Sequence, residues 1–157
     1  MLLLIREKAN KLYPKGGFTL KDDQLKYILQ QIDLAECEEV IENYIYYSRR
    51  PVRQRCSHGD GTYGYVTDEY EFLIIAENGE KQAIILRCGR IDLHWYVLRR
   101  WRKHGVLSNA LRTGIIKEIW PENKKITCCY SYGENYEEKF EMTQHLADIA
   151  GLKLEDD

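Results

Sequence analysis

The chain has 157 residues and a mass of 18.6 kDa, a length that suits one domain with a core of its own. With 44% apolar residues, 31% charged residues and only 3 Pro, the composition excludes collagen-like, disordered and disulfide-scaffold proteins. The formal net charge is -2, the mean hydropathy is -0.53, and no apolar run approaches the roughly 20 residues of a membrane span.

The first 50 residues are predicted to form three helices. The apolar run at residues 1–5 is too short for a secretory signal, so it is assigned to the buried face of a first helix. The apolar positions of the three helices recur at helical spacing: Leu2, Ile5, Ala9 and Leu12; Leu25, Ile28, Leu29 and Ile32; Cys37, Val40, Ile41, Tyr44 and Ile45. Arg49 and Arg50 suit the negative end of the third helix dipole, and Pro51 is expected to stop that helix.

Residues 51–133 are predicted to form an antiparallel sheet. Segments 62–76 and 81–90 are rich in β-branched and aromatic residues, and Asn78-Gly79 between them favours a type I′ hairpin turn. Segment 93–102 allows a helix or a strand, and its Trp, Tyr and Val content favours a strand. Segments 114–120 and 125–132 are expected to form a second hairpin around a turn at 121–124.

A last helix is expected from Asn135 to a cap at Gly151. Its apolar positions are Phe140, Met142, Leu146 and Ile149. The expected fold class is therefore α+β, with N-terminal helices, an antiparallel four- or five-stranded meander sheet and a C-terminal helix. We expect a single domain over 1–157, with a helical part at 1–50, the sheet at 51–133, and the C-terminal helix with an acidic tail at 134–157.

Two stretches hold the basic excess, residues 49–55 and 87–104, and the second interleaves Arg with His, Trp and Tyr. Such a mixture can pair phosphates and stack on bases, and it can also form a protein-interface hot spot. An ordinary solvated sheet face with buried Trp residues is the third explanation. The candidate binding residues are Arg53, Arg55, His94, Tyr96, Arg99, Arg100, Arg102 and Lys103.

Alternation along segment 93–102 would separate two faces of a strand. The more apolar face should pack on the helices, apart from Arg99, and it holds Leu93, Trp95, Val97, Arg99 and Trp101. The other face should meet solvent or a partner, and it holds His94, Tyr96, Leu98, Arg100 and Arg102. The chain has 12 Tyr residues, and those bunched at 44–47, 63–65 and 130–136 suit either a wet recognition surface or half-buried sheet positions.

No catalytic signature is complete. Residues 59–66 match GxGxxGxV, but the other kinase motifs are missing and the context differs from that of a dinucleotide fold. The enzymatic alternative is a phosphate-bearing substrate held by Arg53, Arg55 and His58 beside this glycine loop. Zinc would need the fold to assemble Cys56, His58 and Cys88, because only one closely spaced ligand pair exists. We therefore expect neither a metal nor a cofactor.

The five cysteines are odd in number and include no CxxC, so reduced thiols in the cytoplasm are expected. The sequence predicts a small non-enzymatic recognition protein, without a membrane segment, that binds a nucleic acid or a nucleic-acid-handling protein. An inhibitor or accessory factor of a phage or mobile element is a niche that suits such a protein. The remaining alternative is a structural subunit that oligomerises through Trp95 and Trp101, and the oligomeric state stays open.

Overall fold

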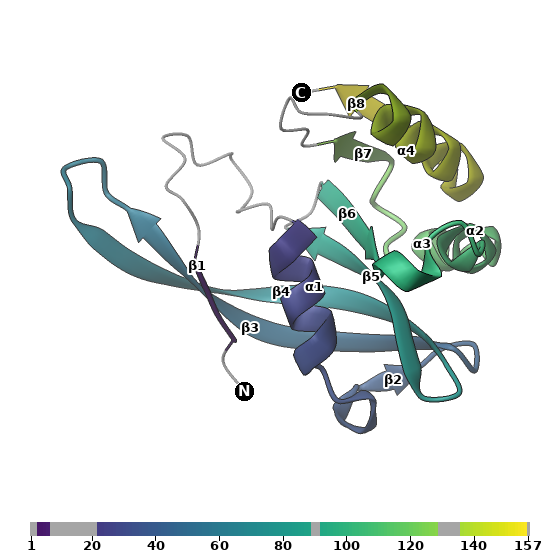
Figure 1. Ribbon diagram of the computed structural model, residues 1–157, viewed down its shortest axis with the longest axis horizontal. Helices are drawn as coiled ribbons and strands as arrows, with labels where there is room; N and C mark the ends of the chain where they lie inside the picture. Colours follow the sequence, from purple (N-terminus) through teal and green to yellow (C-terminus); the bar gives the residue numbers. More distant parts are fainter. Residues whose placement is uncertain (1–2, 7–21, 89–91, 129–135, 157) are drawn as a thin grey trace.

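A computed structural model describes residues 3–6, 22–88, 92–128 and 136–156 (Figure 1). The elements in chain order are β1 (Leu3–Arg6), α1 (Asp22–Gln31), η1 (Leu34–Glu36), β2 (Glu39–Val40), β3 (Ile45–Ser57), β4 (Tyr63–Glu77), β5 (Glu80–Cys88), β6 (Asp92–Val97), η2 (Arg99–Trp101), α2 (Val106–Arg112), α3 (Ile115–Ile119), β7 (Lys125–Cys128), α4 (Tyr136–Ala150) and β8 (Lys153–Asp156). The α+β class predicted from the sequence is confirmed.

One large sheet organises the molecule. Its strand order is β1-β3-β4-β5-β6, and the short β2 also pairs with β3. Strands β2 to β6 are antiparallel to their neighbours, as the predicted meander requires, whereas β1 joins β3 in parallel. The predicted turn at Asn78-Gly79 is confirmed, because both residues have positive φ, 53° and 77°, as a type I′ hairpin turn needs.

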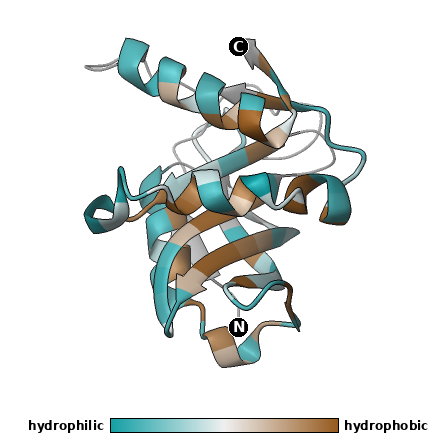
Figure 2. Cartoon of the chain, turned by 90° about the vertical axis from the view of Figure 1, so that its right-hand side faces the viewer, coloured by the Kyte–Doolittle hydropathy of each residue, from teal (hydrophilic) through white to brown (hydrophobic). Residues whose placement is uncertain are grey.

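The two faces of the sheet support two separate cores. In β4, Leu73 and Ile75 point to one face while Phe72 and Ile74 point to the other, and all four are at most 2% exposed. The first core packs against α2, α3 and α4, and the second packs against α1. Helices therefore cover both faces of the central sheet, with apolar residues gathered between the layers (Figures 1 and 2).

Of the three helices expected in the first 50 residues, only the second is confirmed. Helix α1 buries the residues that carried the prediction, Leu25, Ile28 and Leu29, and Ile32 follows just after its end. The first helix is wrong where it can be tested, because residues 3–6 form β1, while Ala9 and Leu12 lie outside the described residues.

The third predicted helix is also wrong, since residues 34–57 form η1, β2 and β3. The apolar positions at 40, 41, 44 and 45 fit a helix, but they also fit a tight hairpin. In that hairpin the Ile41 N–H donates to the Ile45 carbonyl at 2.7 Å, and the Ile45 N–H donates to the Glu42 carbonyl at 2.9 Å. Pro51, expected to end a helix, lies within β3. Continuous pairing of β3 with β4 over 13 positions outweighs the local periodicity.

The second predicted hairpin is replaced by a helix and a parallel strand pair. Residues expected to form its first strand form α3, in which Ile115 and Ile116 are buried, and the C-cap Trp120 is buried just after it. Strand β7 confirms part of the second strand, but it pairs in parallel with β8. A parallel pair needs a crossover, and α4 provides it.

Helix α4 confirms the last predicted helix and its cap. Gly151 has φ +71°, its N–H donates to the Asp148 carbonyl at 3.2 Å, and the Leu152 N–H donates to the Ala147 carbonyl at 2.9 Å, which is a Schellman motif. The buried face contains Leu146 as expected, but Met142 is 54% exposed. No helix in the described part of the chain is long and apolar enough to cross a bilayer.

Candidate recognition arm

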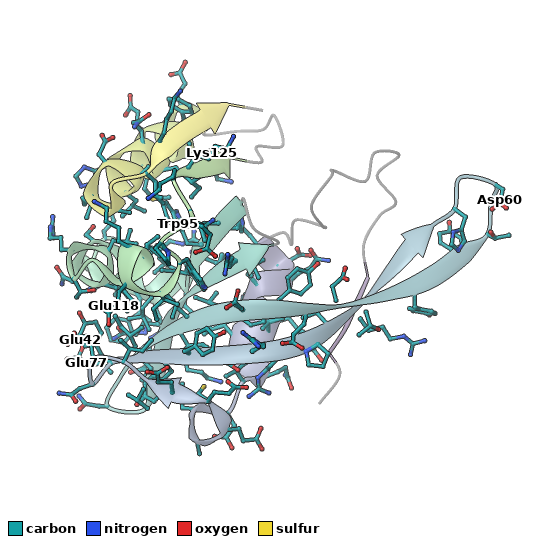
Figure 3. The ribbon with its side chains drawn as sticks, turned by 180° about the vertical axis from the view of Figure 1, so that it is seen from behind. Glu42, Asp60, Glu77, Trp95, Glu118 and Lys125 are labelled. Atoms are coloured by element: carbon teal, nitrogen blue, oxygen red, sulfur yellow. The ribbon has the colours of Figure 1, made fainter. Side chains whose placement is uncertain are left out.

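Strands β3 and β4 are much longer than the strands beside them. Strand β5 pairs with β4 only from Glu71 onward, although the β3–β4 ladder continues to Ser57 and Tyr63. The outer part of this hairpin therefore extends beyond β5, and we call residues 49–69 the arm (Figure 1). Its base still belongs to the body, because Val52 is buried in the second core, whereas the part nearer the tip projects. Asp60 lies at its far end, opposite the end of the hairpin where Glu42 and Glu77 lie (Figure 3).

The tip of the arm is a hydrogen-bonded turn. The His58 N–H donates to the Thr62 carbonyl at 3.0 Å, and the Asp60 carboxylate accepts from the Thr62 N–H at 2.8 Å and from the Thr62 hydroxyl. Gly59 and Gly61 have φ of +82° and +90°, values that favour glycine. The Thr62 hydroxyl and amide lower the pKa of Asp60 by stabilising the carboxylate. The first two glycines of the GxGxxG match are thus explained by turn geometry.

One face of the arm presents tyrosine and arginine. Tyr63 and Tyr65 are 58% and 52% exposed. The guanidinium carbon of Arg53 lies 4.0 Å from the centroid of the Tyr65 ring, which is a cation–π contact. Alternation along the ladder places these three side chains on the face that carries the first core nearer the body.

His58 lies on the opposite face. A Cβ added at Gly64 would come within 2.5 Å of the His58 Nε2 atom, so the imidazole rests directly on this glycine. Gly64 alternates with Tyr63 and Tyr65, and therefore His58 and Arg53 do not converge. The enzymatic alternative built on Arg53, Arg55 and His58 has no support from this geometry. The side chain of Arg55 lies outside those that the structure describes.

The arm carries both signs of charge. Residues 49–69 include four Arg, at 49, 50, 53 and 55, against three acidic residues, at 60, 68 and 69. The Arg49 Nε lies 3.2 Å from Glu69 Oε1, and the Arg50 Nη2 lies 3.8 Å from Glu36 Oε2. Local pairing of this kind leaves little net positive potential for phosphates.

The described part of the basic stretch, residues 87–88 and 92–104, lies elsewhere, and several of its side chains contact other parts of the protein. His94 Nε2 lies 3.0 Å from Asp22 Oδ1 in α1, and this hydrogen bond is the main cause that lowers the pKa of Asp22. Tyr96 packs against the second core, and the Arg102 guanidinium carbon lies 5.5 Å from the centroid of its ring. Both side chains are half-buried because α1 packs over this face, so the face predicted to meet solvent or a partner is only partly exposed.

The other face of β6 is as predicted. Leu93 and Trp95 are buried in the first core against the helices, and Val97 packs beside them. The strand ends at Val97, however, so alternation does not extend to the residues of η2. Among those that follow, Arg99 is exposed, Arg100 pairs with Glu80 at 2.6 Å, and Lys103 has a positive φ of 64°.

A partly buried ionic cluster lies where the arm meets the body. The Glu71 carboxylate accepts from the Tyr47 hydroxyl at 2.7 Å and from Arg87 Nη1 at 2.8 Å, and Arg87 also pairs with Glu122. Burial alone would raise the pKa of Glu71, but the Tyr47 hydrogen bond and the Arg87 charge lower it. The Arg87 side chain is only 11% exposed, so its guanidinium pairs within the protein and is not available to a ligand.

The predicted binding residues thus do not form one site. Arg53 lies on the arm, on the face of the first core, whereas His94 and Tyr96 lie on the face of the second core. Tyr63 and Tyr65 are exposed on the arm and are not among the residues that the sequence predicts to bind. Their signal in the sequence was a Tyr-x-Tyr repeat beside a glycine-rich turn.

Among the described side chains, candidate metal ligands do not cluster. No group of three or more His, Cys, Asp or Glu residues suited to a metal ion occurs among the described residues. The predicted zinc ligands Cys56 and Cys88 have side chains outside those described, while Cys37 is free and half-buried. Burial raises the pKa of the Cys37 thiol, so this cysteine lacks the environment of a reactive thiolate.

Comparisons with protein-family models, with curated proteins and with solved structures found no match to this chain.

Proposed function

We propose that this protein is a non-enzymatic recognition module whose target is another protein, bound through the arm. The observation that carries the proposal is the exposed pair Tyr63 and Tyr65 on one face of a projecting ribbon, with Arg53 stacked on the second ring. Tyr and Arg are the residues most enriched among interface hot spots. Each tyrosine offers a rigid apolar ring with a polar tip, which is ordered at low entropic cost.

The charge layout favours a protein target over a nucleic acid. Phosphate binding depends on several unpaired Lys and Arg side chains that line one surface. Here Arg49, Arg87 and Arg100 each pair with a glutamate of the same chain. The mixed charges of the arm match the polar rim of a protein interface. The proposed role as an inhibitor or accessory factor, acting in a reducing cytoplasm, is compatible with such a surface.

The test compares two substitutions of exposed tyrosines. Wild-type protein, the double variant Tyr63→Ala/Tyr65→Ala and the control Tyr27→Ala are immobilised and used to capture partners from the native host. Tyr27 is 45% exposed on α1, so it matches the arm tyrosines in type and exposure. A captured protein is then purified and its affinity for each variant is measured by calorimetry.

The proposal expects the arm variant to lose tenfold or more in affinity, because each hot-spot tyrosine contributes about 1–2 kcal/mol. The Tyr27 variant should bind as the wild type does. Equal binding by all three proteins would overturn the role of the arm. Micromolar binding of a labelled duplex or single strand of about 30 nucleotides, weakening steeply with salt, would instead indicate a nucleic-acid target.

A further inference from the structure

Among the described residues, one edge of the arm has no paired strand. Two backbone hydrogen bonds define which residues of β4 face β3: the His58 N–H donates to the Thr62 carbonyl, and the Ala76 N–H donates to the Tyr44 carbonyl. Each pair continues the β3–β4 register by one step, at either end of the ladder, and both consist of even-numbered residues. In an antiparallel ladder the bonding direction alternates, so Tyr65, Thr67 and Glu69 direct their N–H and C=O groups away from β3.

No described strand pairs with this side of β4 between residues 64 and 69. Strand β5 takes up the ladder only at Glu71, opposite Arg87. The open segment is six residues long, or about 20 Å at the usual rise of a strand. This length is sufficient for one added strand.

The other edge of the same hairpin is protected along most of its length. The Tyr47 carbonyl accepts from the Glu38 N–H at 3.0 Å, and the Arg49 N–H donates to Glu38 Oε2 at 3.1 Å. Pro51 has no N–H to leave unpaired, and β1 pairs with residues 52–55. Natural proteins usually blunt or cover the exposed edges of their sheets, because an open edge can pair with another chain. An edge with no described partner, beside one that is protected, is therefore a candidate site for an added strand.

We propose that the open edge of β4 binds an extended segment of the partner protein as an added antiparallel strand. This inference rests on the proposed function, since it specifies how the arm engages its target. Main-chain hydrogen bonds to Tyr65 and Thr67 provide the affinity, and side chains at alternate positions provide the specificity. The antiparallel direction is chosen because it continues the geometry of the sheet and gives the more stable pairing.

The side chains along the edge define the chemistry of the incoming strand. Asp68 is exposed at the inner end, beside Glu69, which is exposed but paired with Arg49, so the segment should carry Lys or Arg opposite Asp68. Tyr65 lies toward the tip with Arg53 on its ring, so a β-branched or aromatic residue should lie opposite it. The expected ligand is a short extended peptide with a basic N-terminal end and a β-branched or aromatic C-terminal end.

The experiment uses a fluorescein-labelled synthetic peptide, Lys-Arg-Thr-Val-Thr-Val-Thr, measured by fluorescence anisotropy. Its control has the same side chains but N-methyl groups on alternate amides, which remove the donors of one edge. The variant Thr67→Pro removes one outward N–H of β4 and no bond to β3. Its matched control, Thr67→Val, retains that N–H and the β-branched shape.

We expect saturable binding to the wild type and to Thr67→Val, and at least tenfold weaker binding to Thr67→Pro and of the N-methylated peptide. Amide exchange provides a second readout that needs no variant. In the free protein the amides of Tyr65 and Thr67 should exchange faster than those of Gly64 and Asp68, and the peptide should slow only the fast pair. Uniform protection along the segment, or absence of saturation at millimolar peptide, would overturn the open edge.

Two other results separate this inference from the proposed function. If the purified partner binds Thr67→Pro as tightly as the wild type but loses affinity for Tyr63→Ala/Tyr65→Ala, the arm binds through its face and strand addition is wrong. If the chain alone forms dimers that Thr67→Pro abolishes, the edge belongs to a second copy of this chain and the peptide ligand is overturned.

Discussion

Replacing Arg87 by Met should destabilise the protein far more than replacing an exposed arginine. The Arg87 side chain is 11% exposed and bonds to Glu71, whose side chain is 22% exposed. Losing one partner of a fully buried ion pair costs about 3–5 kcal/mol, because the other charge stays desolvated. Here Glu71 keeps its bond from Tyr47, so a cost of about 2–3 kcal/mol is expected.

The control is Arg100→Met. Arg100 pairs with Glu80, but the two side chains are 68% and 43% exposed, so this change should cost less than about 1 kcal/mol. Urea unfolding at pH 7, followed by circular dichroism, measures both free energies. A double-mutant cycle that combines Arg87→Met with Glu71→Gln measures the coupling energy between these two residues directly.

The pH dependence tests the same reasoning independently. The pKa of Glu71 lies below its ordinary value of 4.5 in the folded protein. Its contribution to stability is therefore complete above that value and is lost as the pH falls through the lower, folded pKa. For this reason the difference in free energy of unfolding between wild type and Arg87→Met should become smaller below about pH 4.5. Equal losses for the two arginine variants at pH 7, or a gap independent of pH, would refute the argument.

Three further outcomes are expected. Asp22→Asn should lower the free energy of unfolding by about 0.5 kcal/mol at neutral pH, because the hydrogen bond to His94 is partly exposed. This difference should vanish as the pH falls below 3.8, the ordinary pKa of Asp22, and acid protonates the carboxylate, which an acid titration of unfolding can show. Lys103→Gly should raise the free energy of unfolding by about 0.5 kcal/mol because Lys103 has φ +64°, and a lower unfolding midpoint would contradict this. Gly64→Ala should displace the His58 ring and shift its NMR resonances with little change in the unfolding midpoint, since the imidazole is exposed and can swing away.

The parts of the fold that the sequence predicted correctly are those where local preference and tertiary pairing agree. The helical spacing of Leu25, Ile28 and Leu29 has no competing strand partner, and Asn78-Gly79 suits the same turn in isolation and in the sheet. Gly151 likewise caps α4 by its own conformational freedom.

The failures occur where distant partners decide. Residues 37–45 have helical periodicity, yet they form a hairpin in which β2 pairs with β3, while β3 in turn pairs along its length with β4. The pairing of Leu3–Arg6 with residues 52–55 is a contact between segments almost 50 positions apart, which no local pattern records. At the candidate site, alternation correctly separated Leu93 and Trp95 from His94 and Tyr96. It could not show that α1 partly covers the second pair.

The parallel pairing of β1 with β3 has a consequence for synthesis. The hairpins β3–β4, β4–β5 and β5–β6 connect neighbours in the chain, so each can form soon after its second strand leaves the ribosome. Strand β1, with the apolar residues Leu3, Leu4 and Ile5, must await residues 52–55. At about 5–20 residues per second this delay is several seconds, during which an apolar strand lacks its partner. Chaperone binding to this segment during translation would be the natural safeguard, and ribosome profiling of chaperone-bound nascent chains would reveal it.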